Sequence, residues 1–183
     1  MFTLERLALC GFLTFAAPVA AFAENPRFGH PIDPADAASW DISIPPDGAG
    51  LPPGRGTAAQ GEMVYAAKCQ ACHSEKGGGG PNDRLVGGVG TLGPDKTPVR
   101  TVGSYWPYAT TLFDYVRRAM PWDKPKSLSD DEVYAVSAYI LSLNGIIGSD
   151  DVIDAQSLPK IKMPNRDGFI PFPRYPPRPA GGG

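Results

Sequence analysis

The sequence predicts an all-α domain between two extended, proline-rich flanks. Two capping-box patterns mark helix starts, at Thr57–Gln60 and Ser129–Glu132. In each, the first side chain accepts from the backbone N–H of the fourth residue, whose own side chain reaches back to the first backbone N–H. Seven of the 21 prolines lie in residues 26–53 and seven more in residues 159–179. Proline fixes φ and lacks an N–H, so these flanks disfavour helix.

The first helix is predicted to start at Thr57 and to run into the only cysteine pair outside the N-terminal segment. Gly61 lies inside it, although glycine costs a helix interior about 1 kcal/mol relative to alanine. The glycine therefore indicates close approach by another element. Tyr65 follows four residues later and lies on the same face.

Two further helices are predicted after the cysteine pair. One covers approximately residues 110–119 and ends before Pro121. The other begins at Ser129 and ends at Asn144-Gly145, residues that tolerate a left-handed conformation. Each has an apolar side. In the first helix it is formed by Leu112, Phe113 and Val116. In the second, residues at steps of three and four form a stripe that Tyr139 borders: Val133, Val136, Ile140 and Leu143. No strand is predicted.

The run Cys69-Gln70-Ala71-Cys72-His73 matches the attachment pattern of c-type haem. Each thiol forms a thioether with one haem vinyl group, and two intervening residues let both sulfurs reach one porphyrin edge. His73 then falls under the iron as the proximal ligand. We predict one covalently attached haem c.

A redox-active disulfide and a zinc site are the alternative interpretations of this motif. A disulfide motif of the thioredoxin kind is expected near a βαβ pattern, which the sequence lacks. Tetrahedral zinc needs four ligands, and outside the motif only His30 adds a cysteine or histidine after the N-terminal segment. Both alternatives fit poorly.

The second axial ligand decides between electron transfer and substrate chemistry. Met120, in Met120-Pro121 at the end of a predicted helix, is the first candidate, because the proline projects the thioether from a loop. Met163, His30 and an open site are the alternatives. A His/Met pair raises the reduction potential and closes the iron to substrate, which favours electron transfer.

The second ring nitrogen of His73 needs an acceptor that fixes the imidazole orientation. Gly80-Pro81 is predicted to supply a backbone carbonyl, in a loop made tight by the glycines from Gly77 to Gly80. Three aromatic side chains are candidates for the haem crevice, with ordinary core packing as the alternative: Trp106, Tyr108 and Trp122.

The N-terminus reads as a signal peptide over residues 1–23, with Arg6, an apolar run over residues 7–20 and an Ala21-Phe22-Ala23 cleavage site. A lipoprotein with Cys10 lipidated and an uncleaved anchor are the alternatives. We predict a periplasmic protein without stable membrane insertion.

After the signal peptide, the chain is predicted to divide into an extended arm at 24–56, a haem domain at 57–145 and a proline-rich extension at 146–183. The net charge of −2 gives no support to nucleic-acid binding.

With these elements the chain resembles a class I cytochrome c, on Gly61 and Tyr65, the CQACH motif, Gly80-Pro81, Met120-Pro121 and the Val136/Tyr139 helix face. A narrower resemblance is to the haem domain of the cytochrome subunit of sulfane dehydrogenase, from the Sox sulfur-oxidation system. It rests on Trp40-Asp41-Ile42, on residues 51–56 and above all on TVGSYWPYATTLFDYVRRAMPW at 101–122.

This resemblance implies an electron-transfer subunit that performs no bond chemistry of its own. Its implied partners are a molybdenum-cofactor dehydrogenase subunit that oxidises sulfane or sulfite and a downstream acceptor such as a small cytochrome c. Members of that family often carry two haem domains, whereas this chain has one CxxCH. It therefore resembles a shortened subunit or the partner of a related sulfite dehydrogenase. A free shuttle between respiratory complexes and a haem enzyme or sensor with an open sixth site are the alternatives.

The tail from Pro159 onward is basic, with five cationic side chains against Asp167 alone: Lys160, Lys162, Arg166, Arg174 and Arg178. Phe169, Phe172 and Tyr175 lie among its prolines. Such a segment is expected either to dock along a larger partner or to wrap its own domain.

Overall fold

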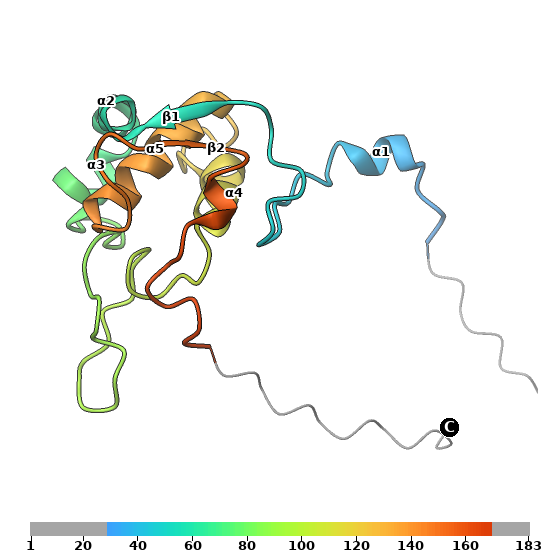
Figure 1. The fold of residues 1–183 in the computed structure, drawn as a ribbon. Coiled ribbons are helices and arrows are strands. Elements are labelled where there is room, and N and C mark those ends of the chain that lie inside the picture. The colour runs from blue at the N-terminus through green and yellow to red at the C-terminus, as the bar shows by residue number, and fades with distance from the viewer. Residues whose placement is uncertain (1–28, 170–183) are drawn as a thin grey trace, which may run out of the picture.

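The computed structural model describes residues 29–169 (Figure 1). The predicted signal peptide and the tail residues after 169 lie outside this range. A helical body carries the N-terminal arm on one side, and the short helix α1 (Pro34–Ala38) in that arm buries no residue. The prediction of an all-α domain with extended flanks is confirmed, although one turn of the arm is helical.

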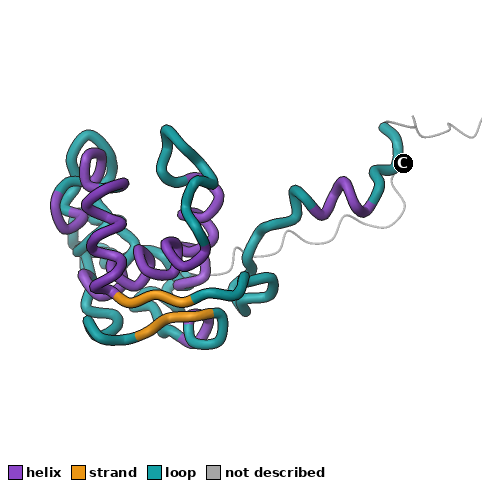
Figure 2. The backbone as a smooth tube through the Cα atoms, turned by 90° about the horizontal axis from the view of Figure 1, so that it is seen from above, coloured by secondary structure: helices purple, strands orange, loops and turns teal. Residues whose placement is uncertain are grey.

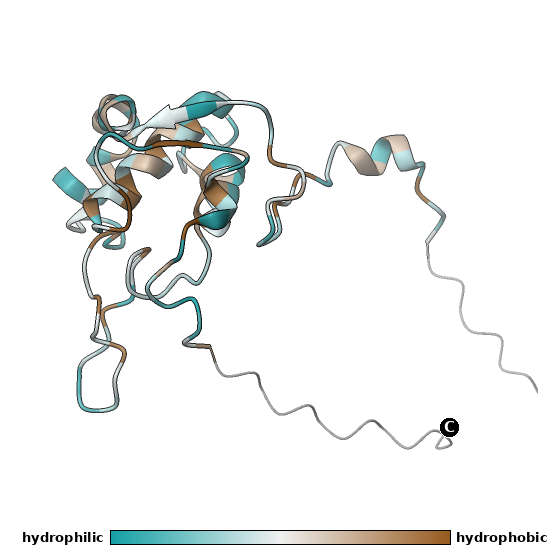
Figure 3. Cartoon of the chain, viewed as in Figure 1, coloured by the Kyte–Doolittle hydropathy of each residue, from teal (hydrophilic) through white to brown (hydrophobic). Residues whose placement is uncertain are grey.

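Three helices form the body, as predicted: α2 (Ala58–Lys68), α4 (Ala109–Ala119) and α5 (Asp130–Leu143). Both predicted capping boxes are present, at the starts of α2 and α5. The end of α5 is also as predicted, because Gly145 adopts a φ of 67° and the Ile146 N–H donates to the Leu141 carbonyl. Figure 3 shows hydrophobic residues gathered where α4 and α5 face each other.

Helices α2 and α5 cross at Gly61, as the glycine indicated. A Cβ on Gly61 would collide with the Ala135 carbonyl oxygen and lie 2.8 Å from the Tyr139 Cβ. Tyr65 and Tyr139 pack at the same crossing, with ring centroids 5.3 Å apart. Only a residue without a side chain lets the two backbones approach this closely.

We therefore expect Gly61→Ala to destabilise the fold although alanine is the better helix former. Forcing a methyl group against a helix backbone costs about 1–3 kcal/mol, which exceeds the ~1 kcal/mol gain in propensity. Urea unfolding measures the difference. Met63→Ala is the matched control, because Met63 lies in the same helix with 69% of its surface exposed. Equal stability of Gly61→Ala and the wild type would contradict the close crossing.

A two-stranded sheet was not predicted and is present. Strand β1 (Arg55–Thr57) pairs antiparallel with β2 (Val152–Asp154), with Gly56 opposite Ile153 (Figure 2). Each strand has three residues, too few to show an alternating pattern in the sequence. The pairing brings together segments that lie on either side of the helical domain.

The segment after β2 continues into the core. Ile153, Leu158 in the 3₁₀ turn η2 (Leu158–Lys160) and Met163 each expose 2% of their surface or less. Tight packing thus continues past residue 145, where the sequence indicated the end of the haem domain. Proline content alone did not distinguish a packed extended segment from a free one.

The described part of the basic tail contacts its own domain. Lys162 forms a β-bridge with Tyr108, and the Arg166 guanidinium lies 4.2 Å from the Tyr108 ring centroid. The Asn165 side chain donates to the Tyr105 carbonyl at 2.8 Å. Residues 160–169 therefore wrap the domain, and docking of the tail along a partner stays a prediction, with residues 170–183 outside the described range.

The buried Tyr134 makes the fold sensitive to alkaline pH. Its hydroxyl donates to the Pro52 carbonyl at 2.9 Å, and burial, followed by the charges of Asp130 and Asp154, raises its pKa to about 12. In the unfolded chain a tyrosine has a pKa of about 10. Between these values the unfolded chain has lost its proton and the folded chain keeps it, so deprotonation favours unfolding.

We expect the free energy of unfolding to be constant below about pH 10 for this group and to fall by about 2–3 kcal/mol as the pH rises to about 12. Urea titrations at several alkaline pH values measure the slope. Tyr134→Phe should be less stable at neutral pH and show a shallower alkaline decline. If stability declines equally steeply in Tyr134→Phe, the alkaline loss of stability comes from other groups. Tyr65 is one such group, because burial also raises its pKa to about 12.

Candidate functional site

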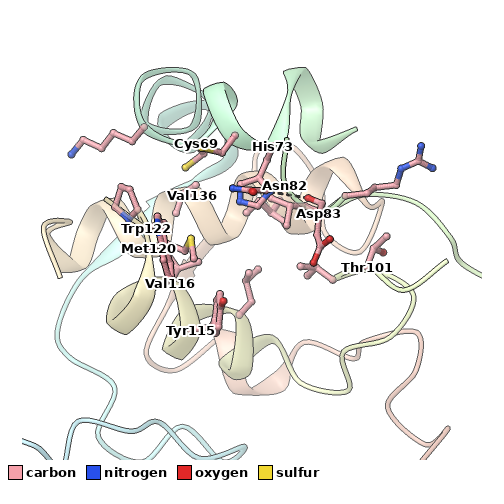
Figure 4. Close-up of a pocket in the computed structure, with 18 of the residues that line it drawn as sticks. Cys69, His73, Asn82, Asp83, Thr101, Tyr115, Val116, Met120, Trp122 and Val136 are labelled. Carbon is pink, nitrogen blue, oxygen red and sulfur yellow. Dashed lines mark hydrogen bonds between the residues drawn. The ribbon is translucent and has the colours of Figure 1, made fainter. Parts of the chain in front are cut away.

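A cavity of about 280 Å³ lies between the CQACH turn, the loop at 82–85 and helices α4 and α5 (Figure 4). Four predicted cofactor residues line it: Cys69, Cys72, His73 and Met120. Its walls are largely apolar, formed by Leu85, Val102, Trp106, Leu112, Val116, Val136 and Ile140 among others. The fold thus brings His73 and Met120, which lie 47 positions apart in the sequence, to the same cavity.

The CQACH motif forms a single helical turn, α3 (Gln70–His73), directly after α2. Cys69 caps α2 by donating its N–H to the Tyr65 carbonyl, and its own carbonyl accepts from the His73 N–H at 3.0 Å. This turn places both thiols and the imidazole at the cavity. Both cysteines are free thiols, with Cys72 exposed and Cys69 partly buried. Burial raises the pKa of Cys69 to about 11, so its thiol is protonated at neutral pH.

His73 is oriented by a hydrogen bond to the loop that follows α3. Its Nδ1 lies 2.8 Å from the carbonyl oxygen of Asp83. A carbonyl only accepts, so Nδ1 carries a proton, and in the neutral imidazole Nε2 then keeps its lone pair. This is the tautomer that a metal-binding histidine requires.

The prediction that Gly80-Pro81 supplies this acceptor is wrong. The Asn82 N–H donates to the Cys72 carbonyl and the Gly80 N–H donates to the Asn82 carbonyl, both at 3.0 Å, which turns the loop back below α3. The turn presents the Asp83 carbonyl to the ring, two residues after Pro81. Pro81 also does not line the cavity, whereas Asn82 and Asp83 do. No sequence signal marks Asp83, because any residue can offer a backbone carbonyl.

Met120 ends α4, as predicted. Its N–H donates to the Val116 carbonyl at 3.1 Å, and Pro121 then turns the chain away from the helix. Figure 4 shows its sulfur at the cavity from the α4 side, while Cys69 and His73 approach from α2 and α3. The two alternatives lie elsewhere: Met163 is buried in the core with 1% exposure, and His30 is exposed in the N-terminal arm.

Two of the three predicted crevice aromatics, Trp106 and Trp122, line the cavity. Tyr108 does not, because it pairs with Lys162 and the Arg166 side chain covers its ring. Three cationic residues were not predicted for the cavity and lie on its lining: Lys68, Arg84 and Arg100. Within residues 29–169, no group of three or more His, Cys, Asp or Glu side chains is placed to hold a metal ion.

No helix in the described range is both long enough and apolar enough to cross a membrane. No curated protein sequence matches the chain significantly. A family model does match, over residues 56–140, described as cytochrome c oxidase, cbb3-type, subunit III.

The chain also matches a solved structure, the sulfane dehydrogenase SoxCD from Paracoccus pantotrophus. The sequence identity is 38% and the TM-score is 0.73, over 82% of this chain and 74% of that chain. The cavity with its CQACH turn lies in the stretch that the family model also covers. The chain therefore belongs to the class I cytochrome c family and is related to a chain of sulfane dehydrogenase.

Proposed function

We propose that this chain is a periplasmic, mono-haem c-type cytochrome that accepts electrons from a molybdenum-dependent sulfane or sulfite dehydrogenase subunit and passes them to a downstream carrier. The carrier is a protein such as a small cytochrome c. The observation that carries the proposal is the meeting of Cys69, Cys72, His73 and Met120 on one apolar cavity. Haem c, the cofactor of this family, supplies a reversible one-electron centre when bound.

The residues on the cavity fit this cofactor. Two free thiols in one helical turn would form the two thioethers, and His73 presents an unprotonated Nε2 because Asp83 accepts from its Nδ1. Met120 offers the soft thioether sulfur that completes a His/Met pair. Apolar walls exclude water from such a site and thereby raise its reduction potential.

The cysteines provide a direct test of the mode of attachment. Cys69→Ala and Cys72→Ala should each leave one thioether, and the double variant should lose haem completely on a denaturing gel that is stained for haem peroxidase activity. Met63→Ala, an exposed change nearby, should retain it. Covalent haem in the double variant would overturn the assignment.

The partner assignment is supported by the 38% identity to a chain of the sulfane dehydrogenase SoxCD. The single CxxCH supports one haem per chain. A Met120 ligand leaves no open coordination position, which supports a role in electron transfer without catalysis of its own. The signal-peptide pattern supports export, and mature protein isolated from the periplasm should begin directly after Ala23.

The decisive experiment mixes the oxidised holoprotein with the candidate molybdenum subunit and then adds sulfite or a thiosulfate-derived sulfane. The haem absorption should change to that of the reduced form only when subunit and substrate are both present. Reduction by substrate alone would indicate an enzyme with an open site. If neither substrate leads to reduction of the haem, although small cytochromes c reduce the same protein readily, a free shuttle is favoured.

A further inference from the structure

The N-terminal arm holds the helix that ends in Met120. Ile44 is 7% exposed and its N–H donates to the Asp114 carboxylate of α4 at 2.9 Å. Asp114 is itself 9% exposed and also pairs with Arg118, one turn further along the helix. A buried carboxylate thus fixes the arm backbone to α4 by a charge-assisted hydrogen bond.

The arm and the cavity lie on opposite faces of α4. Thr110, Asp114 and Arg118 are spaced by four residues and share one face. The Thr110 hydroxyl makes a longer hydrogen bond, 3.5 Å, to the Pro46 carbonyl of the arm. The cavity is lined instead by Leu112, Tyr115 and Val116. Helix α4 is therefore held between the arm behind it and the haem cavity in front.

A second contact joins the arm to the chain after Met120. The Lys126 ammonium lies 5.8 Å from the centroid of the Trp40 ring, and Trp40 is 78% exposed. Asp114 precedes Met120 by six residues, about 9 Å along a helix, and Lys126 follows it by six. The arm thus contacts the Met120 segment on both sides in sequence.

We infer that residues 40–46 of the arm are a positioning element for the sixth ligand, which press α4 toward the cavity and so keep the Met120 sulfur at the iron. This inference rests on the proposed ligation by Met120. Releasing Asp114 should let α4 move back and weaken the bond between sulfur and iron. An external ligand would then displace Met120 more easily.

The test is imidazole binding to the oxidised holoprotein, followed by haem absorption together with the reduction potential. Asp114→Ala removes a hydrogen bond to a charged acceptor, so imidazole should bind at least about tenfold more tightly. Asp114→Asn keeps an oxygen acceptor for the Ile44 N–H and should restore most of the wild-type affinity. The exposed change Trp40→Ala, which leaves the core intact, should tighten imidazole binding about two- to fivefold.

Asp131→Ala is the matched control. Asp131 on α5 also anchors the arm, by accepting from the Arg55 N–H at 2.8 Å, and unlike Asp114 it does not belong to the helix that ends in Met120. It should lower stability and leave imidazole affinity unchanged. Wild-type affinity in Asp114→Ala and Trp40→Ala, or an equal increase in Asp131→Ala, would overturn the positioning role. Met120→Ala separates the two proposals, because unchanged imidazole affinity in that variant would instead overturn ligation by Met120.

Discussion

Replacing Met120 by alanine should leave haem attached, lower its reduction potential and open the iron to external ligands. On the proposed ligation, the Met120 thioether would stabilise the reduced state and fill the sixth position. The residues that line the cavity include no other methionine. We expect a decrease of about a tenth of a volt or more, within the ~0.8 V range that axial ligands span. Carbon monoxide should bind readily to the reduced variant at neutral pH and not to the wild type.

Met163→Ala is the matched control for ligation. Met163 is 1% exposed and packs in the core away from the cavity, so its loss should reduce stability without changing the potential. The opposite pattern, an unchanged potential in Met120→Ala and a lowered one in Met163→Ala, would move the ligand to Met163.

The second large effect, a loss of folding stability, is expected from Leu158→Ala. Leu158 has no exposed surface although it lies in a proline-rich segment outside the three main helices. Truncating a fully buried leucine costs about 2–5 kcal/mol, since the surrounding side chains only partly fill the space. Thermal or urea unfolding measures this loss.

The neighbouring Ile161→Ala serves as the control for Leu158→Ala, because Ile161 is only partly buried at the edge of the same cluster. A markedly smaller loss is expected there. If Leu158→Ala is as stable as the wild type, residues 146–163 are an appendage and the domain ends near residue 145, as the Asn144-Gly145 helix stop indicated.

The local features were predictable because each depends on neighbours in the sequence. The capping boxes at Thr57 and Ser129 place helix starts to within a residue. Gly61 inside a predicted helix indicated the crossing of α2 with α5, because the loss of helix propensity at a glycine needs a compensating close contact. The CQACH spacing and the Met-Pro helix end likewise indicated residues that the fold places on one cavity.

The remaining features depend on which distant segments meet. The Asp83 carbonyl carries no residue signature, and its role arises only from how the 77–85 loop folds below α3. The sheet between residues 55–57 and 152–154 is too short for periodicity. Burial of Ile153, Leu158 and Met163 likewise follows from contacts between distant segments, β2 with α5 and η2 with α4, and not from the pattern of the segment itself.

The sequence by itself thus determined three helices, their caps, the haem attachment motif and a methionine suited to the sixth position. Only the tertiary structure decided that Met120 and not Met163 reaches the cavity, which carbonyl orients His73, and that Ile44 of the arm and the segment 153–163 pack against the helices. The physical reason is that capping and covalent attachment act over a few residues, whereas burial and hydrogen bonds between distant segments depend on the complete packed fold.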